Sequence, residues 1–252
     1  MKFFILTIII VGVVFAGYVD LIHAATLPDY VIPCKRNDPN IEKCIVNAVN
    51  HIKPHLKNGI KDLNVPAMEP LSLGTLNILE SGSSGINVKA IDLNIYGASN
   101  FEIRKFKISD DGLRYDFELN LPHLEGEGHY DISGKILTLP IKGRGPFTGN
   151  FDNFYAFVKL IVEKTVIDGE EYLRVKDLQV KVRTGKGNIN LQNLFNGDKT
   201  LGDVVNDTIN QNFELFTNEL IGPIERALDK KFLAIARKIM ENFTYNELFP
   251  TN

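Results

Sequence analysis

The chain has 252 residues, a length typical of about one or two domains. Hydrophobic residues make up 44% and charged residues 23%, as in an ordinary soluble globular protein. The formal net charge is −3, and the sequence contains no block of lysine and arginine. The composition therefore argues against a surface that binds nucleic acids or anionic membranes, because such a surface needs a basic patch.

The amino terminus has the pattern of a secretory signal peptide. Lys2 precedes an uninterrupted apolar run that ends at Ala16, and Ala24 is a small residue suited to cleavage. The alternative is a membrane anchor, but a span needs roughly 20 apolar residues and this run is shorter. We expect residues 1–24 to be removed. Residues 25–252 would then form a single secreted, extracellular domain without stable membrane insertion.

The chain has two cysteines, Cys34 and Cys44. In an oxidising compartment an isolated close pair favours a disulfide, which would contribute about 3 kcal/mol in the chain-entropy model. Metal binding is the weaker alternative, because no histidine or third cysteine lies nearby at ligand spacing.

The first predicted helix runs from Pro39 to about Lys57. Its apolar residues recur at helical spacing, and Asn58-Gly59 is a suitable stop. Pro54 is expected to bend the last turn.

From Leu71 to about Phe195 the hydrophobic period changes to two, which predicts strands. Tight turns at Asp110-Asp111-Gly112 and at Ile167-Asp168-Gly169-Glu170 predict hairpins in an antiparallel meander. The stretch Gly143–Gly149 is interpreted as a kinked turn or bulge between strands.

The segment 151–166 is apolar on both faces. As a strand it places Phe154, Val158 and Leu160 on one face and Tyr155 and Phe157 on the other. A helical interpretation also fits, but the β-branched and aromatic content and the hairpin that follows favour a strand. The second face has to meet a protein layer, a membrane or a carried molecule.

After residue 198 the period returns to 3.6, which predicts helix to about residue 239 with a kink or split at Pro223. Asn206, Asn210 and Asn212 are expected to cap or bridge backbone groups. Asn206 and Asn242 also begin Asn-x-Thr sequences and are candidate glycosylation sites. Helix that follows a long meander without a linker predicts one α+β domain, in which a long helix lies against a broad sheet.

The sequence does not favour an enzyme. His51 and His55 could face a metal from one side of a helix, but no third ligand is evident. The carboxylates are spread out, and no pair can be assigned acid and base roles. We predict no catalytic residues, no metal and no cofactor.

Several stretches together resemble the insect takeout and haemolymph juvenile hormone binding protein family, most closely its takeout-like branch. They follow the family's order over essentially the whole mature chain: Leu27-Pro28 to Cys34, Asn37-Asp38-Pro39, Cys44-Ile45, Gly59 to Pro66, Glu69-Pro70, Tyr130 to Ile136, Gly145 to Gly149, Asn193 to Lys199, Leu201-Gly202 and Asn206, Asn210 and Asn212. The family's first disulfide matches Cys34 and Cys44. The hormone binders of the moth type have a second disulfide, for which this chain has no cysteines.

The resemblance implies a long α-helix wrapped by a strongly curved antiparallel β-sheet that encloses a hydrophobic tunnel, as in lipid-transfer proteins. It implies a secreted haemolymph carrier of a small lipophilic ligand, such as a terpenoid hormone or a fatty-acid-like lipid. The alternative is an extracellular signalling or interaction protein of the same fold with no transported ligand. A further alternative, a membrane-active lipid binder, would favour a basic tip.

On this basis we assign one face of 151–166 to helix packing and part of the other to a ligand channel. Tyr130 is the candidate polar contact, since its hydroxyl could bond an epoxide, ester or carboxylate. The candidate apolar lining consists of Ile45, Val49, Ile52, Leu93, Phe117, Leu119, Phe157, Leu160, Phe213, Phe216 and Leu220.

Overall fold

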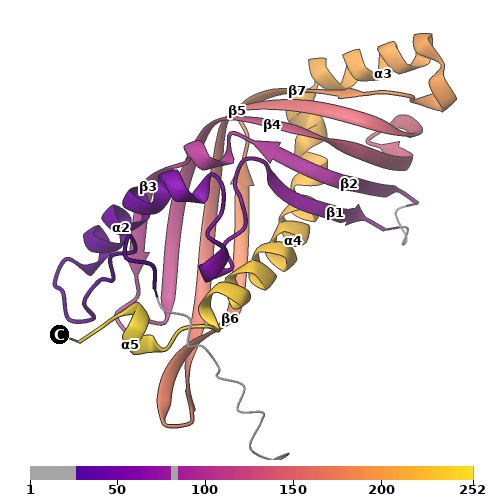
Figure 1. Ribbon diagram of the computed structural model, residues 1–252. Coiled ribbons are helices and arrows are strands. Elements are labelled where there is room, and N and C mark those ends of the chain that lie inside the picture. The colour runs from indigo at the N-terminus through magenta and orange to yellow at the C-terminus, as the bar shows by residue number, and fades with distance from the viewer. Residues whose placement is uncertain (1–26, 81–84, 252) are drawn as a thin grey trace, which may run out of the picture.

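The structure, a computed structural model, describes residues 27–80 and 85–251. The predicted leader at residues 1–24 lies outside the described residues. The molecule is elongated, with a strongly curved sheet and one long helix that runs diagonally across it (Figure 1). The predicted α+β fold, a long helix wrapped by a curved antiparallel sheet, is confirmed.

In the described part of the chain, one seven-stranded antiparallel sheet has the order β1-β2-β4-β5-β6, with β3 paired to β4 and β7 paired to β5. The strands are β1 (Leu71–Leu79), β2 (Asn87–Tyr96), β3 (Glu102–Ile108), β4 (Arg114–Ile136), β5 (Leu139–Ile167), β6 (Glu170–Arg183) and β7 (Lys186–Leu191). This confirms the predicted meander. Because β4 and β5 are so long, each has a different neighbour at its two ends, and the sheet curves along its length.

Strand β5 includes the whole of 151–166, which confirms the predicted strand. The turn or bulge predicted at Gly143–Gly149 is wrong, because these residues continue β5 in one register with β4. The glycines do not form a turn. They allow another segment of the chain to pack closely against β5. A Cβ on Gly143 would come within 2.8 Å of the Tyr130 hydroxyl and 3.0 Å of Cα of Leu194, which crosses the strand there.

Both predicted hairpins are confirmed. Asp110–Gly112 lies between β3 and β4, where the Ser109 amide donates to the Arg114 carbonyl at 2.9 Å. Between β5 and β6, Asp168 (φ 52°) and Gly169 (φ 87°) are both in the left-handed region. This matches the turn type whose twist fits that of the flanking strands.

The α-helices of the described residues are α2 (Ile41–Leu56), α3 (Lys199–Gln211), α4 (Phe213–Met240) and the short α5 (Tyr245–Leu248). Three 3₁₀ turns in the same ranges are η1 (Lys61–Leu63), η2 (Ala98–Asn100) and η3 (Phe195–Gly197). Helix α2 confirms the helix predicted from Pro39 to about Lys57.

The carboxy-terminal helical run divides at Asn212, so of the kink or split predicted at Pro223 the split is wrong and the kink stays a prediction. Helix α4 continues through Pro223. At Asn212 the backbone leaves the helical region (φ −117°, ψ 34°), and its side-chain amide donates to the Thr208 carbonyl at 2.9 Å. The Asn212 side chain thus caps the end of α3 at the break, whereas Pro223, which lacks only one amide donor, lies inside α4.

Helix α4 lies along the free edge of β6 through side-chain hydrogen bonds. The Glu225 carboxylate accepts from the Val182 amide at 3.0 Å, and Asp229 accepts from the Val180 amide. Arg237 donates to the Val175 carbonyl at 3.1 Å. These residues satisfy backbone groups that a strand edge would otherwise leave unpaired.

Helix α3 protects β7 in the same way. The Asn206 side chain accepts from the Leu191 amide at 2.8 Å and donates to the Leu191 carbonyl at 2.9 Å. Asn210 makes the same pair of bonds to Ile189 at 2.8 and 2.9 Å. The prediction that these asparagines bridge or cap backbone groups is confirmed.

Candidate ligand-binding site

The inner face of the sheet carries a continuous apolar surface across three strands. Three successive rungs pair an apolar residue on β4 with one on β5 and one on β6. The rungs are Tyr115–Leu160–Leu178, Phe117–Val158–Val180 and Leu119–Ala156–Val182. This surface faces α4, since Val158 and Leu160 pack in one cluster with Leu228, Ile224 and Phe232.

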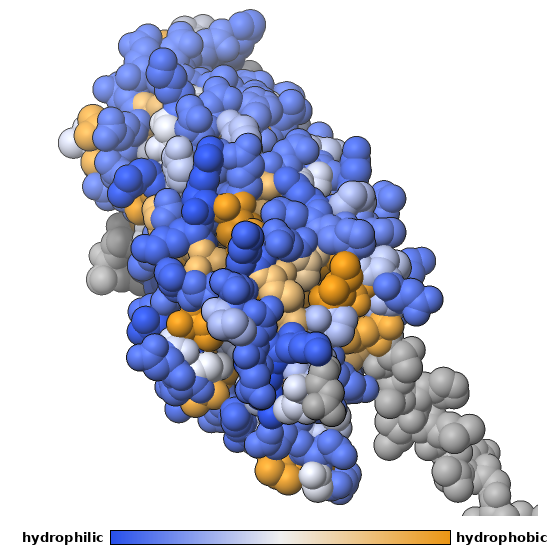
Figure 2. All heavy atoms as spheres, turned by 90° about the vertical axis from the view of Figure 1, so that its left-hand side faces the viewer, coloured by the Kyte–Doolittle hydropathy of each residue, from blue (hydrophilic) through white to orange (hydrophobic). Residues whose placement is uncertain are grey.

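The apolar interior extends along the molecule as linked clusters. Leu160 belongs both to the cluster under the middle of α4 and to the cluster that contains Ile45 of α2 and Phe117 of β4. Phe147 links the middle cluster to one around Tyr130, Phe216 and Leu220. Several of these side chains stay partly accessible although they lie between two layers. Figure 2 shows apolar side chains gathered in a hollow between hydrophilic ridges on the side of the molecule where α2 lies.

The structure places most of the predicted lining residues inside, in two groups. In the first group, Ile45, Phe117 and Leu160 share one cluster, Val49, Ile52 and Leu119 share its neighbour, and Leu93 is buried under α4. In the second group, Phe216 and Leu220 pack beside α3, and Phe213 packs on Phe151 with ring centroids 6.2 Å apart. The lining role of these residues stays a prediction.

Phe157 does not belong with them. In the register it stands opposite Glu118 of β4 and Lys181 of β6, so it lies on the outer face of the sheet, and its neighbour Val158 lies on the inner one. The assignment of part of this outer face to a ligand channel is therefore wrong. Because strand side chains alternate, the inner face alone carries both the helix contacts and the candidate channel.

Tyr130 is buried and already has a hydrogen-bond partner. Its hydroxyl donates to the Gln192 carbonyl at 2.6 Å, and burial raises the pKa of Tyr130 to about 12. This bond ties β4 to the segment that crosses Gly143. Contact with a ligand would require the hydroxyl to share or exchange this partner.

Residues of α4 and β6 were missed by the sequence analysis. Val180 and Val182 of β6 extend the inner face of the sheet beside β5, and Ile224, Phe232 and Leu233 of α4 form the wall opposite it. The helical stripe on α4 and the alternation of β6 were visible, but which strand lies beside α4 was not.

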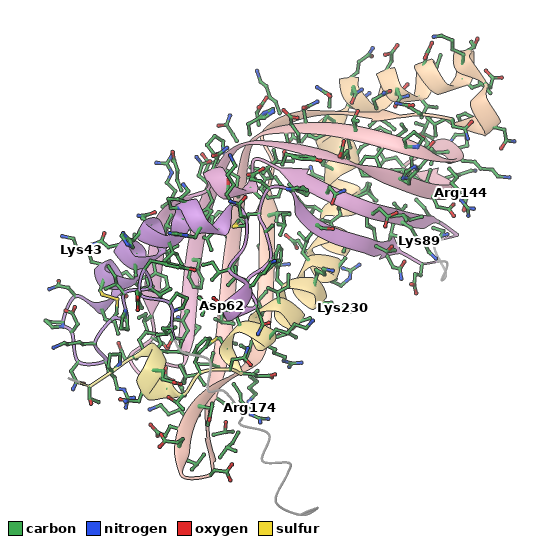
Figure 3. All side chains as sticks on the ribbon, in the orientation of Figure 1. Lys43, Asp62, Lys89, Arg144, Arg174 and Lys230 are labelled. Carbon is green, nitrogen blue, oxygen red and sulfur yellow. A yellow bond between two sulfur atoms is a disulfide. The ribbon has the colours of Figure 1, made fainter. Side chains whose placement is uncertain are left out.

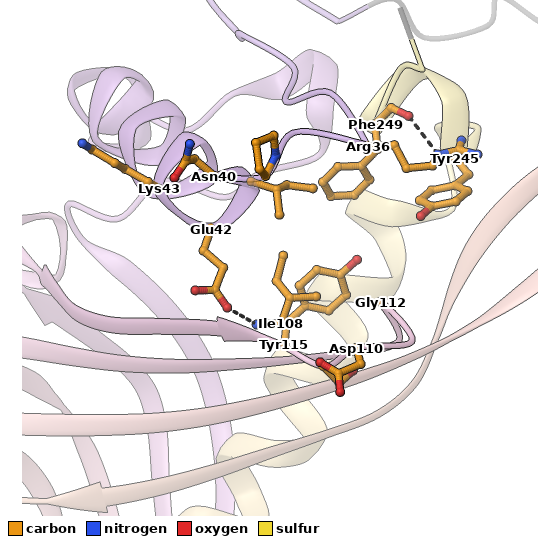
Figure 4. A pocket seen from close by; sticks show the side chains of 13 residues that line it. Arg36, Asn40, Glu42, Lys43, Ile108, Asp110, Gly112, Tyr115, Tyr245 and Phe249 are labelled. Atoms are coloured by element: carbon orange, nitrogen blue, oxygen red, sulfur yellow. Dashed lines mark hydrogen bonds between the residues drawn. The ribbon is translucent and has the colours of Figure 1, made fainter.

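A polar cavity of about 420 Å³ lies at the α2 end of this interior (Figure 4). Tyr115 lines it, and the same side chain ends the apolar row of β4, so the cavity adjoins the interior. Arg36 lies 3.8 Å above the Tyr245 ring and donates to the Phe249 carbonyl at 3.3 Å. Burial, and secondarily the proximity of Tyr245, raises the pKa of Tyr115 to about 12.

Glu42 forms the opposite wall of the cavity. Its carboxylate accepts from Lys107 Nζ at 2.8 Å and from the Ile108 amide at 3.0 Å. These two bonds lower the pKa of Glu42 below its usual value, so it stays ionised at neutral pH. With Lys43 and Asp110, which also line it, the cavity combines two cationic groups, two tyrosines and two carboxylates at the end of an apolar interior.

The disulfide prediction is confirmed, since Cys34 and Cys44 are bonded with Cα atoms 5.9 Å apart. Of the glycosylation candidates, Asn242 is exposed, whereas Asn206 is partly buried with its amide bonded to Leu191. A glycan at Asn206 would have to separate α3 from β7, so the structure favours Asn242.

Two further features concern metals and membranes. Within residues 27–80 and 85–251, no group of three or more histidines, cysteines or acidic residues gathers in a way that suits a metal ion. Over the same ranges, none of the helices combines the length and the apolar character that crossing a membrane requires.

The family model of haemolymph juvenile hormone binding proteins matches residues 7–250. The circadian clock-controlled protein daywake of Drosophila melanogaster is 30% identical over 86% of this chain and 87% of its own length. A candidate beta-carotene-binding protein of Schistocerca gregaria is 20% identical over 85% of this chain and 86% of its own length. The crystal structure of Epiphyas postvittana Takeout 1 has the same fold, with a TM-score of 0.74 and 23% identity, over 86% of this chain and 98% of that one.

Proposed function

Because the chain belongs to the haemolymph juvenile hormone binding protein family, we propose that it is a secreted carrier that holds a small hydrophobic ligand inside its curved sheet. The observation that carries this proposal is the apolar inner face of β4, β5 and β6 beneath α4. Burial of a ligand's apolar surface there stabilises the complex by roughly 25 cal/mol per Å², less the cost of ordering.

The polar cavity at the α2 end supports a particular class of ligand. An amphiphile with a hydrocarbon body and one polar end would place the body along Leu119, Phe117 and Leu160. Its polar end would reach Tyr115, Tyr245 and Arg36. The hydroxyls and the guanidinium donate hydrogen bonds, and the carboxylates of Glu42 and Asp110 disfavour an anion, so an ester or carbonyl would suit the cavity.

Two features of the chain support secretion. The Cys34–Cys44 disulfide is typical of proteins that function in an oxidising compartment, and the residues before it have the pattern of a leader. Native mass spectrometry of the secreted protein, followed by solvent extraction, would identify a ligand that purifies with it. An empty protein that also ignores fatty acids and terpenoid hormones would favour the signalling or interaction protein instead.

Two adjacent residues of β5 provide a matched test. Val158→Trp adds volume to the inner face and is expected to reduce uptake of a fluorescent fatty acid, added from alcohol solution, by roughly five- to 150-fold, since forcing extra volume into the interior costs about 1–3 kcal/mol. Phe157→Trp places the same side chain on the outer face and is expected to leave uptake unchanged. Equal uptake by both variants, with each folded by circular dichroism, would contradict the proposed site.

A further inference from the structure

Strand β6 carries a row of basic residues on its exposed positions. Arg174, Lys176, Lys181 and Arg183 are all exposed, whereas the intervening Val175 and Val180 are buried. In the register Lys181 stands opposite Phe157 and Arg183 opposite Tyr155, which places these two on the outer face of the sheet.

Helix α4 adds two more basic residues beside this row. Glu225 and Asp229 hydrogen-bond the Val182 and Val180 amides, so the next residues on the helix, Arg226 and Lys230, lie close to the same stretch of β6. Both are exposed, and a spacing of four residues puts them on one face of the helix. We name Arg174, Lys176, Lys181, Arg183, Arg226 and Lys230 the basic band. Figure 3 labels Arg174 on β6 and Lys230 on α4.

The carboxylates of β6 and α4 within the band are already engaged, whereas Glu163 of β5 stands opposite Arg174 and Glu118 of β4 stands opposite Phe157. Glu225 is buried and accepts from Lys181 Nζ at 2.6 Å as well as from β6. Asp229 accepts from the Val180 amide, and Asp177 accepts from Leu178 and Gln179. In the described part of the chain, the other five members of the band form no ion pair. Their charges are therefore available to an anionic partner.

Aromatic and aliphatic side chains lie next to the band. Tyr155, Phe157 and Ile161 are partly exposed on the outer face of β5 and stand opposite Arg183, Lys181 and Asp177 of β6. Aromatic residues beside lysine and arginine suit the interface between lipid headgroups and hydrocarbon. This arrangement also gives a reason for the second apolar face of 151–166.

We propose that the basic band and the outer face of β5 together dock the protein on an anionic lipid surface. The inference rests on the proposed function, because a carrier of a water-insoluble ligand has to take it from, or deliver it to, a membrane. A lipid surface presents many phosphates without fixed spacing, which matches a row of flexible basic residues. An acidic protein with fixed carboxylates would be expected to use a shaped pocket, and the polar cavity beside α2 is lined by other residues.

The test measures flotation of the full secreted chain with phosphatidylcholine vesicles that do or do not contain phosphatidylserine. We expect binding only to the anionic vesicles, with loss at high salt. Removal of three band charges (Arg183→Gln, Arg226→Gln and Lys230→Gln together) is expected to weaken binding on the order of 100-fold, about fivefold for each charge. The matched control removes the same charge at exposed sites elsewhere, through Lys61→Gln, Lys135→Gln and Lys142→Gln.

Each outcome is informative. Loss in the band variant with retention in the control would support the proposal. Binding that both variants keep, or no vesicle binding by the unmodified protein, would overturn it. Retention on a polyglutamate column that only the band variant loses, without vesicle binding, would point to an acidic protein partner. Fatty-acid uptake from alcohol solution is measured separately, so a protein that docks but takes up no ligand would refute the carrier and leave docking intact.

Discussion

His123 and Asp152 show how a cross-strand pair on the outer face sets the charge of one side chain. They stand opposite each other in β4 and β5, with His123 Nδ1 2.6 Å from the Asp152 carboxylate. The bond to Asp152, and to a smaller extent the one to Glu125 at 3.3 Å, raises the pKa of His123 above its usual value of 6.5. The folded protein therefore favours the protonated ring more than the unfolded chain does.

This pair predicts a pH dependence with a definite sign. Because the pKa of His123 is raised on folding, the pair stabilises the protein below pH 6.5, and this contribution is lost as the pH rises through the raised value. Both side chains are about half exposed, at 49% and 56%, so the gain is no more than about 1 kcal/mol. Asp152→Asn is expected to lower the pKa of His123 in an NMR titration, and Glu125→Gln to lower it less. An unchanged pKa in Asp152→Asn would contradict this account.

At the scale of elements, helices protect both free edges on this side of the sheet. Helix α4 bonds to β6 through Glu225, Asp229 and Arg237, and α3 bonds to β7 through Asn206 and Asn210. Side chains thus complete the backbone pairing where no further strand follows. These contacts fix the distance of α4 from the inner face of the sheet and its position along β6.

The asparagine contacts can be tested by one substitution. Asn206→Ala leaves the amide and the carbonyl of Leu191 without their partners, and it is expected to lower the free energy of unfolding by about 2 kcal/mol. The control, Asp207→Ala, changes an exposed neighbour on α3 and is expected to alter stability by less than about 0.5 kcal/mol. Urea unfolding of unglycosylated protein measures both. Equal stability of the two variants would show that the contacts contribute little.

At the scale of the whole molecule, the interior joins α2, the sheet and α4 into one apolar unit. The clusters share residues from one end to the other, so a ligand within them would contact elements far apart in the sequence. Ligand binding to the folded state alone should therefore stabilise the whole domain.

Thermal unfolding provides the corresponding prediction. A ligand present at about 100 times its dissociation constant is expected to add about 2.7 kcal/mol. For a domain of this size the melting temperature would rise by roughly 5–10 °C. Val158→Trp should show a much smaller rise at the same ligand concentration, and Phe157→Trp the full rise. A ligand that binds without shifting the melting temperature would contradict binding in the interior.

The local elements of this protein were largely predictable from its sequence. Three features depend only on residues that are close together in the chain. They are the alternation of side chains through 151–166, the Asp168-Gly169 turn and the apolar stripe of α2. The predictions were wrong where contacts with a segment remote in the sequence determine the local structure. Gly143 looked like a turn because the chain that crosses it, near Leu194, is remote in sequence.

By itself the sequence determined most strands and helices through local periodicity, the disulfide through its single pair of cysteines, and the family through the resemblance of its ordered motifs. Only the tertiary structure decided which face of β5 is inside, since a strand that is apolar on both faces does not specify it. It also joined Glu225 of α4 to the Val182 amide of β6, and so formed a basic band from both elements in a chain whose net charge is −3. Overall charge is a sum over residues, whereas a binding surface depends on which residues become neighbours, and the pairing of β6 with α4 determines that.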